Sequence, residues 1–236
     1  AQGGNAVATG DSSIAIGNTS LASGDYGTAV GPFAVAQGAS SAAFGDTANA
    51  LGDNSVAVGS NAYAGSGNGI AIGNGAYVAP LGDWDIAGLH VKHPTEGIAI
   101  GAGSSVTGVY GTAIGGYSEA GGKYATALGA RATSAGKGMT AGGGSATASA
   151  EQATAVGTYS EASGVASSAF GKGAYAGGMG STALGVDAAA TGQLSIAIGA
   201  TSRADGNFGI GIGHYANAYG LGSIALGIGA TGAGTG

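Results

Sequence analysis

The sequence predicts an all-β fold, a parallel β-solenoid built from coils of equal length, and three regularities predict it. Glycine recurs at a fixed period of fourteen, small and large side chains alternate between the glycines, and tyrosines and charged residues keep to particular places in the period. A fixed internal period of this kind is the mark of a repeat architecture. The chain should therefore consist of one small unit stacked many times.

The glycine period runs through almost the whole chain of 236 residues. From Gly3 to Gly227 every fourteenth residue is glycine, with the single exception of Ala87. A second glycine follows half a period after the first in most repeats, as Gly24 follows Gly17. Because glycine adopts turn conformations at little cost, each coil should consist of two half-coils with a corner at each glycine.

The alternation between the corners predicts two short strands in each coil. At the third and fifth places after the first glycine the side chains are small, as at Ser20 and Ala22. At the eleventh and thirteenth places they are larger, as at Thr28 and Val30. Residues of the same parity share one face of a strand. We therefore expect both pairs to point inward and to fill a thin core with one small and one large layer.

The tyrosines support this assignment of the inward places. All ten tyrosines, and the charged residues of the repeats, fall outside the four expected inward places. Tyr63 and Tyr77 occupy one place in consecutive coils, as do Tyr110 and Tyr124, so each pair should stack. These four are candidate ligand-binding residues, because tyrosine combines an apolar ring with a hydrogen-bonding group. Stabilisation of the sheet by neighbour packing is the alternative explanation.

One expected outward place is uniform from coil to coil. The residue between the two larger ones is alanine in nearly every coil, whereas the matching place on the other strand varies freely. An outward face restricted to alanine should be covered, and a second copy of the same face is the simplest cover. The predicted interface of this homo-oligomer consists of Ala15, Ala29, Ala43, Ala57, Ala71, Ala99, Ala113, Ala127, Ala155, Ala169, Ala183, Ala197 and Ala225.

The composition argues against several classes of function. A net charge of −6 argues against a nucleic-acid partner, and no apolar run is long enough for a membrane-spanning helix. Charged residues make up 8% of the chain and are scattered, so we expect no enzyme, no metal site and no cofactor. An ice-binding solenoid would need a flat outward array of threonines. Thr112, Thr126, Thr140 and Thr154 do align, but the assignment above places them inward.

The period is interrupted once, by PLGDWDIAGLHVKHPTEG at Pro80–Gly97. We predict one continuous domain in which residues 1–79 and 98–236 form coils and residues 80–97 form an insertion loop; an eroded coil would give the same count. A long loop on a regular scaffold is a natural place for a specific contact. Folding back onto the coils or clasping a neighbouring subunit is the alternative. The candidate ligand-binding residues of this loop are Asp83, Trp84, Asp85, His90, Lys92 and His93.

The repeats resemble a known family. NSVAVGSNAYAGSG, from Asn54 to Gly67, is similar to the head repeat of YadA-like trimeric autotransporter adhesins, and so are LSIAIGATSRADG from Leu194 and STALGVDAAATG from Ser181. The resemblance covers nearly the whole chain. It implies a left-handed parallel β-roll and assembly of three chains on the surface of a Gram-negative bacterium, outside its outer membrane.

The resemblance also implies a function. Family members attach to host extracellular matrix proteins such as collagen, fibronectin or laminin, or to host cell-surface receptors, through many weak contacts. We therefore expect a non-catalytic adhesive head, with a structural spacer as the alternative. The sequence has no recognisable signal peptide, stalk or membrane anchor, so we expect a head fragment that contacts a membrane only through missing parts.

Overall fold

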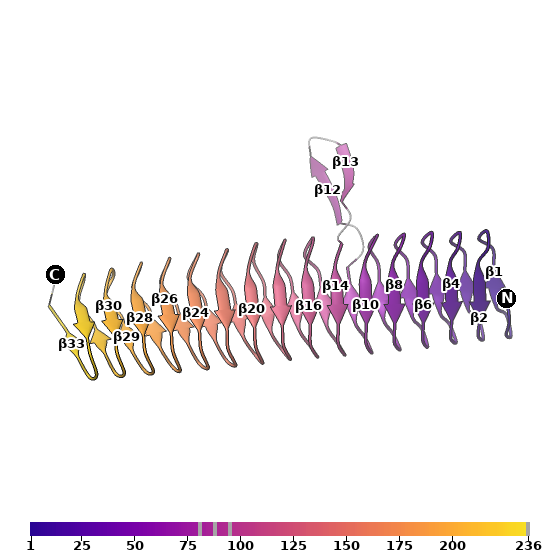
Figure 1. Cartoon of the computed structure of the whole chain (residues 1–236). Coiled ribbons are helices and arrows are strands. Elements are labelled where there is room, and N and C mark those ends of the chain that lie inside the picture. Colours follow the sequence, from indigo (N-terminus) through magenta and orange to yellow (C-terminus); the bar gives the residue numbers. More distant parts are fainter. Residues whose placement is uncertain (80–81, 87–88, 94–95, 235–236) are drawn as a thin grey trace. The chain divides into compact units, whose positions relative to one another are not determined.

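The structure is a computed structural model that describes residues 1–79, 82–86, 89–93 and 96–234, with the backbone alone for 82–86 and 89–93. The chain divides into two units, residues 1–124 and 125–236. Every regular element in these described ranges is a β-strand (Figure 1). The predicted all-β parallel solenoid is confirmed.

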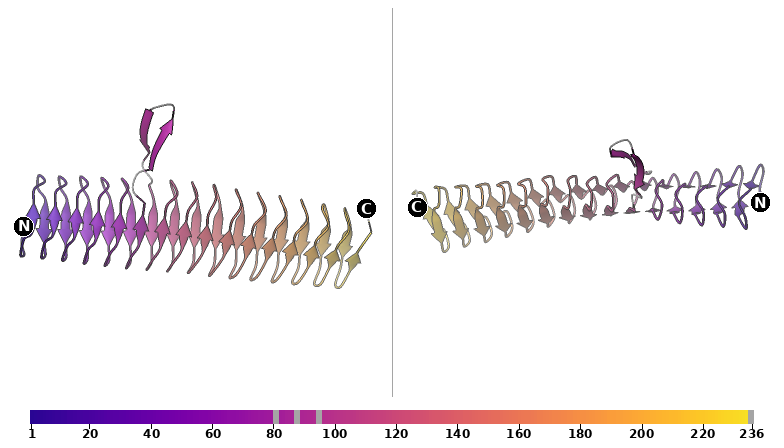
Figure 2. Two further views of the ribbon diagram at one scale, coloured as in Figure 1. Left: turned by 180° about the vertical axis from the view of Figure 1, so that it is seen from behind. Right: turned by 90° about the horizontal axis from the view of Figure 1, so that it is seen from above.

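Each coil contributes one longer and one shorter strand, and each kind forms its own parallel sheet (Figure 2). In unit 1 the three-residue strands are β2 (Ile14–Ile16), β4 (Thr28–Val30), β6 (Ala42–Phe44), β8 (Val56–Val58), β10 (Ile70–Ile72), β14 (Ile98–Ile100) and β16 (Thr112–Ile114). The two-residue strands are β1 (Val7–Ala8), β3 (Leu21–Ala22), β5 (Val35–Ala36), β7 (Asn49–Ala50), β9 (Tyr63–Ala64), β11 (Tyr77–Val78), β15 (Ser105–Val106) and β17 (Glu119–Ala120).

Unit 2 repeats the arrangement. Its three-residue strands are β18 (Thr126–Leu128), β20 (Thr140–Gly142), β22 (Thr154–Val156), β24 (Ser168–Phe170), β26 (Thr182–Leu184), β28 (Ile196–Ile198), β30 (Ile210–Ile212) and β32 (Ile224–Leu226). Its two-residue strands are β19 (Thr133–Ser134), β21 (Thr147–Ala148), β23 (Glu161–Ala162), β25 (Tyr175–Ala176), β27 (Ala189–Ala190), β29 (Arg203–Ala204), β31 (Asn217–Ala218) and β33 (Thr231–Gly232).

The register between coils follows the sequence period. Ala15 pairs with Ala29 and Ala22 with Ala36, one full period apart in both sheets. Both corners of a coil contain a residue in the left-handed region two places after the glycine, as at Thr19 (φ 57°) and Tyr26 (φ 58°). The two corners therefore share this left-handed residue, although their glycines differ: Gly17 has a φ of 133° and Gly24 has no positive φ.

The core between the two sheets holds only small side chains over most of its length. On the two-residue strands the predicted orientation is correct, since Ser20 and Ala22 are fully buried. The Ser20 hydroxyl donates to the carbonyl oxygen of Gly17, 3.0 Å away. This bond satisfies a hydroxyl that would be costly to bury unpaired.

On the three-residue strands the predicted orientation is wrong. The middle alanine is fully buried inside the coil, and the larger residues on either side of it point outward, as at Ala15 between Ile14 and Ile16. The two sheets lie too close together for a layer of large side chains. The two half-coils are related by a shift of half a period, or seven residues. This shift makes Ala29 of the longer strand equivalent to Ala22 of the shorter strand, which is buried, and not to Leu21.

The interrupting segment contains an antiparallel pair of strands, β12 (Gly82–Ile86) and β13 (Leu89–His93). The coils on either side of it pair directly with each other, β10 with β14 and β11 with β15. The solenoid register therefore continues across the segment without an eroded coil between them (Figure 1).

Candidate interaction surfaces

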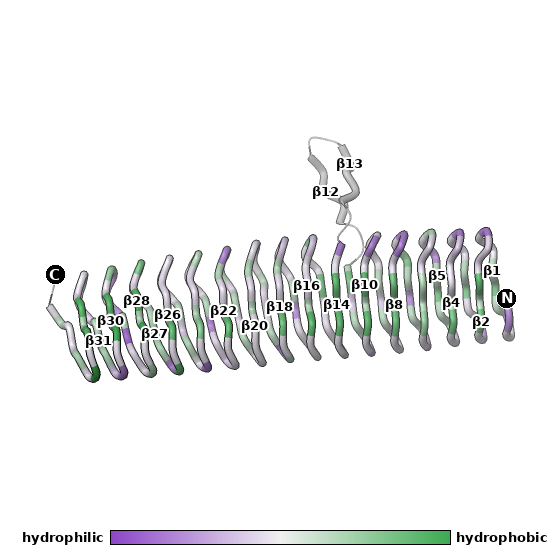
Figure 3. The backbone as a smooth tube through the Cα atoms, in the orientation of Figure 1, coloured by the Kyte–Doolittle hydropathy of each residue, from purple (hydrophilic) through white to green (hydrophobic). Residues whose placement is uncertain are grey.

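Each unit carries an outward face of large apolar side chains. We call it the apolar face and define it as the first and third residues of every three-residue strand. Figure 3 shows these strands as a run of apolar segments. The third residues form its most uniform row, which is interrupted only at Gly142 of β20 among the described strands: Ile16, Val30, Phe44, Val58, Ile72, Ile100 and Ile114 in unit 1, and Leu128, Val156, Phe170, Leu184, Ile198, Ile212 and Leu226 in unit 2.

The side chains of this row are substantially exposed on the single chain. Phe44 is 41% exposed and Leu184 is 46% exposed. Soluble monomers rarely leave so extended an apolar surface uncovered. The sequence prediction missed this face because it assigned these residues to the core.

The alanines predicted as an interface are not on a surface. Every one of them is fully or almost fully buried within its own chain, so none can form the contact face that was expected: Ala15, Ala29, Ala43, Ala57, Ala71, Ala99, Ala113, Ala127, Ala155, Ala169, Ala183, Ala197 and Ala225. Their uniformity has a different cause. Only a methyl group fits between the two sheets at this place in the coil, and close-packed interiors tolerate little extra volume.

The aligned threonines also point outward and not inward. Thr126, Thr140 and Thr154 are the first residues of β18, β20 and β22, and each is partly exposed beside the buried alanine that follows. The row beside them is apolar, with Leu128 and Val156. The threonines therefore form one margin of the apolar face and not a double threonine array.

The predicted tyrosine stacks are confirmed. The rings of Tyr63 and Tyr77 have centroids 5.2 Å apart at 19°, and those of Tyr110 and Tyr124 are 5.3 Å apart at 5°. The Lys123 ammonium lies 5.0 Å from the centroid of the Tyr124 ring, within the range of a cation–π interaction. A ligand-binding role for these four tyrosines stays a prediction.

Many other aromatic side chains stand at the corners of the coils. Phe33, Tyr117 and Tyr159 adopt φ values of 55°, 58° and 59° and are exposed. Left-handed backbone is costly for residues other than glycine and is accepted most readily by asparagine and aspartate. Aromatic rings at these corners are thus held in solvent despite an unfavourable local conformation.

The inserted segment carries the remaining candidate ligand-binding residues. The register of its two strands places Asp83 opposite Lys92 and Asp85 opposite His90. The side chains of Asp83, Trp84, Asp85, His90, Lys92 and His93 lie outside the described part of the structure. Their role in binding stays a prediction.

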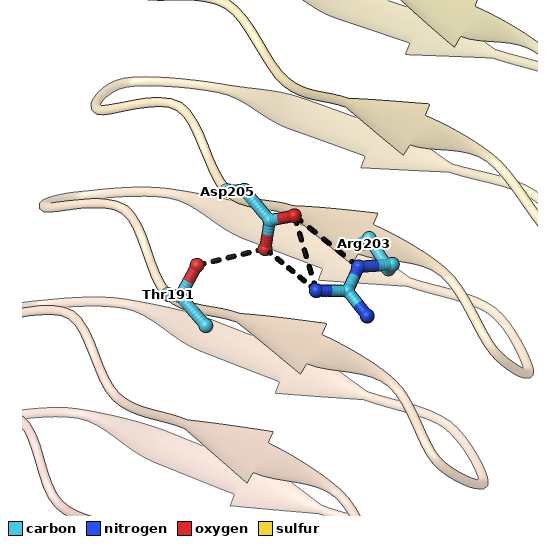
Figure 4. Close-up of polar contacts among 3 residues, drawn as sticks. All are labelled: Thr191, Arg203 and Asp205. Carbon is cyan, nitrogen blue, oxygen red and sulfur yellow. Dashed lines mark hydrogen bonds and ion pairs between the residues drawn. The ribbon is translucent and has the colours of Figure 1, made fainter.

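Charged side chains are sparse, and those of the described coils do not converge. Asp205 accepts hydrogen bonds from the Thr191 hydroxyl (2.8 Å) and from Arg203 Nε (3.2 Å) on the outer face of unit 2 (Figure 4). Lys137 Nζ and Glu151 Oε1 are 4.0 Å apart. Within the described ranges no three histidine, aspartate or glutamate side chains come together as metal ligands, and no helix could span a membrane.

Comparison with known families settles what this repeat is. The family model described as the YadA head domain repeat matches residues 1–76, 95–118, 140–160, 162–188 and 190–230. The chain belongs to this family. The matched repeats lie on both sides of the inserted segment, and most of that segment is not matched. The predicted resemblance is confirmed.

One solved structure similar to this YadA-type head is the collagen-binding domain of the Yersinia adhesin YadA. The sequence identity is 30%, the TM-score is 0.42, and the similarity covers 69% of this chain and 68% of that one. A comparison with curated protein sequences found no match. The head repeats themselves therefore assign the family, and the sequence identity with the Yersinia domain agrees with that assignment.

Proposed function

We propose that three copies of this chain assemble through the apolar face. A surface of large side chains that is present in the coils of both units should be removed from water by association. The family supplies the expected number of subunits. This assignment replaces the alanine interface expected from the sequence, while the expectation of a homotrimer is unchanged.

The assembly is tested by sedimentation equilibrium of the intact protein. A single chain has a mass of 21.6 kDa, and we expect three times this mass for the wild type. The variant Leu184→Asp/Ile212→Asp should sediment as a single chain, because carboxylates in the interface would be desolvated without partners.

The matched control places the same charges on the opposite sheet. Ala189 and Asn217 are outward residues of the two-residue strands β27 and β31. The pair Ala189→Asp/Asn217→Asp should leave the mass at three chains. A wild type that sediments as a single chain at every concentration would contradict the proposal, as would equal dissociation by both pairs.

The biological role we propose is non-catalytic attachment of a bacterial surface to host extracellular matrix or host cells. The head would stand outside the outer membrane of a Gram-negative bacterium and bind collagen, fibronectin, laminin or a cell receptor. Family membership supports this role, and exposed aromatic side chains at many coil corners give a surface suited to repeated weak contacts. A structural spacer is the second candidate.

Attachment is tested with the purified head on immobilised collagen, fibronectin and laminin and on host cells. Two variants locate the contact: a four-residue turn in place of residues 80–97, and Tyr110→Ala/Tyr124→Ala. Loss of binding in one variant assigns the contact to the insertion or to the tyrosine stack. If the wild type binds none of the surfaces, the spacer is favoured.

A further inference from the structure

The sheet of two-residue strands carries an apolar row of its own in the first part of unit 1. The first residue of each of these strands lies on the outward side, beside a buried alanine or valine that follows it. In residues 1–79 most of these first residues are large and apolar. We call them the outer row, and its members are Val7, Leu21, Val35, Tyr63 and Tyr77.

The outer row runs along the stack of coils. The register pairs its first three members with one another in consecutive coils, and it pairs Tyr63 with Tyr77. Asn49 in β7 occupies the one coil between the two groups. Val7 is 43% exposed and Tyr77 is 36% exposed. The six strands from β1 to β11 span about 24 Å at about 4.8 Å per coil, so the row is an extended surface.

The outer row is confined to one part of the chain and to one side of the coil. In unit 2 the same place is held mostly by polar or charged residues, as at Thr133, Glu161 and Arg203. The outward sides of two packed sheets point apart, so the outer row lies on the opposite side of the coil from the apolar face. Assembly of three chains through the apolar face would therefore leave the outer row exposed.

A row of carboxylates runs beside the outer row. Asp11, Asp25 and Asp53 each stand four places after the first residue of a two-residue strand, and all three are exposed. The amide of Asp11 donates to Asp25 Oδ1, and the amide of Ala39 donates to Asp53 Oδ1, both at 2.9 Å. These bonds hold the two carboxylates in place at the corner of the coil. We call the three aspartates the acidic margin.

No positive charge offsets the acidic margin in these coils. Residues 1–79 contain four aspartates, the three of the margin and Asp46, and no lysine, arginine or histidine, so their net charge is −4. This charge repels a second copy of the same surface and any nucleic acid. A partner that covers the outer row should therefore carry basic residues beside its apolar ones.

We propose that the outer row and the acidic margin together bind an amphipathic α-helix of a partner protein. The apolar side of the helix lies on the outer row, and lysines or arginines on its flank pair with the acidic margin. This inference goes beyond the attachment to matrix proposed above. It stands whether the chain forms a trimer or not, because the surface is complete in one chain.

The dimensions of the surface favour a helix over an extended segment. Four residues separate the two rows, so they are at most about 13 Å apart, and a helix about 10–12 Å across reaches both. The turns of a helix rise about 5.4 Å, close to the coil spacing of about 4.8 Å, whereas same-side residues of an extended strand recur about every 6.7 Å. A helix of about 16 residues matches the length of the row.

The test is the binding of a fluorescein-labelled peptide to the full chain, measured by fluorescence anisotropy. The probe is a helical peptide of about 18 residues, with leucines along one side and lysines along the flank. We expect saturable binding of one peptide per chain that weakens as the salt concentration rises. A scrambled peptide of the same composition and a proline-rich peptide of the same charge should bind at least about tenfold more weakly.

The decisive variant is Asp25→Asn/Asp53→Asn. Asparagine preserves the corner, because Asn207 holds the same place in its coil and its Oδ1 accepts from the Gln193 amide at 2.9 Å. The variant should fold as the wild type does. The dissociation constant of the helical peptide should rise about tenfold at low salt, and its salt dependence should fall.

A second variant, Leu21→Thr/Val35→Thr, removes apolar surface from the outer row. Threonine suits this place, since Thr133 and Thr147 hold it in β19 and β21. The variant should weaken binding about tenfold or more, at high salt as well as at low salt, because it leaves the charges unchanged.

The matched control is Glu161→Gln/Asp187→Asn, which removes two carboxylates from unit 2 and should leave the affinity unchanged. Neither matrix binding nor the mass of the assembly enters the measurement, so its outcome is separate from that of the proposed attachment. A wild type without saturable binding overturns the proposal. Equal binding of either comparison peptide, unchanged affinity in both surface variants, or equal weakening by the control also overturns it.

Discussion

At the scale of single residues, a glycine at the first corner of a coil and a glycine within a strand differ in whether a side chain could replace the hydrogen. Gly157 has φ 139°, and a Cβ there would collide with the carbonyl oxygen of Gly171 in the next coil. Gly142 lies in β20 without positive φ, and a Cβ there would make an ordinary contact of 3.6 Å with Val156 Cγ2. The first glycine is therefore required by the backbone, and the second is not.

This difference predicts opposite effects for two identical substitutions. Gly157→Ala should lower the free energy of unfolding by about 3 kcal/mol or more, because strain and collision act together. Gly142→Ala should leave it unchanged or raise it by up to about 1 kcal/mol, because alanine restricts the unfolded chain and fits the strand. Thermal and urea unfolding measure both. Equal destabilisation by the two variants would refute this assignment of the glycines.

At the scale of the strand, the sequence predicted the period, the strand positions and the tyrosine stacks. It exchanged the inward and outward faces of the three-residue strand in each coil. Ala127 and Leu128 alternate in the sequence whichever of them points inward, so alternation alone does not fix the orientation. Hydrophobicity favoured the larger residue as core, and that choice failed because the coil is only wide enough for methyl groups at this place. The equivalence of the two half-coils would have given the correct orientation.

The reversed orientation is tested by substitutions at neighbouring positions. Ala183 is fully buried in β26 and Leu184 is exposed beside it. Ala183→Val should lower the free energy of unfolding by about 1–3 kcal/mol through overpacking. Leu184→Val should change it by less than about 1 kcal/mol, because the side chain makes few contacts within its own chain.

Both substitutions are compared by urea unfolding in the background of Ile212→Asp. This background weakens association through the apolar face, so that the measurement reports on the single chain and not on the interface. A larger loss for Leu184→Val than for Ala183→Val would restore the orientation first expected.

At the scale of the whole molecule, each coil depends mainly on its neighbours, as in other solenoids. The sequence could predict the repeated part for this reason, since one coil defines the next. It could not predict the row of exposed apolar side chains at one corner of the unit 2 coils, because these residues are divided between two neighbouring places in the coil and share no sequence motif: Val165, Met179, Leu194, Phe208 and Leu221. They form one row only when the corners are stacked.

The repeat predicts which deletions the molecule accepts. Removing residues 171–184 should let the coil at 157–170 stack on the coil at 185–198, because corner glycine, left-handed residue and strands keep their register. Removing only 171–177 would put Gly178, which lacks positive φ, in the place of Gly171 at φ 133°. It would also set two-residue strands against three-residue strands.

The deletion of a whole coil should therefore retain a β-rich circular dichroism spectrum and a cooperative unfolding transition at a slightly lower temperature. The deletion of half a coil should lose cooperativity or fail to fold, although it removes only half as much chain. If the shorter deletion proves the more stable of the two, the full coil is not the structural unit, and the half-coil takes its place.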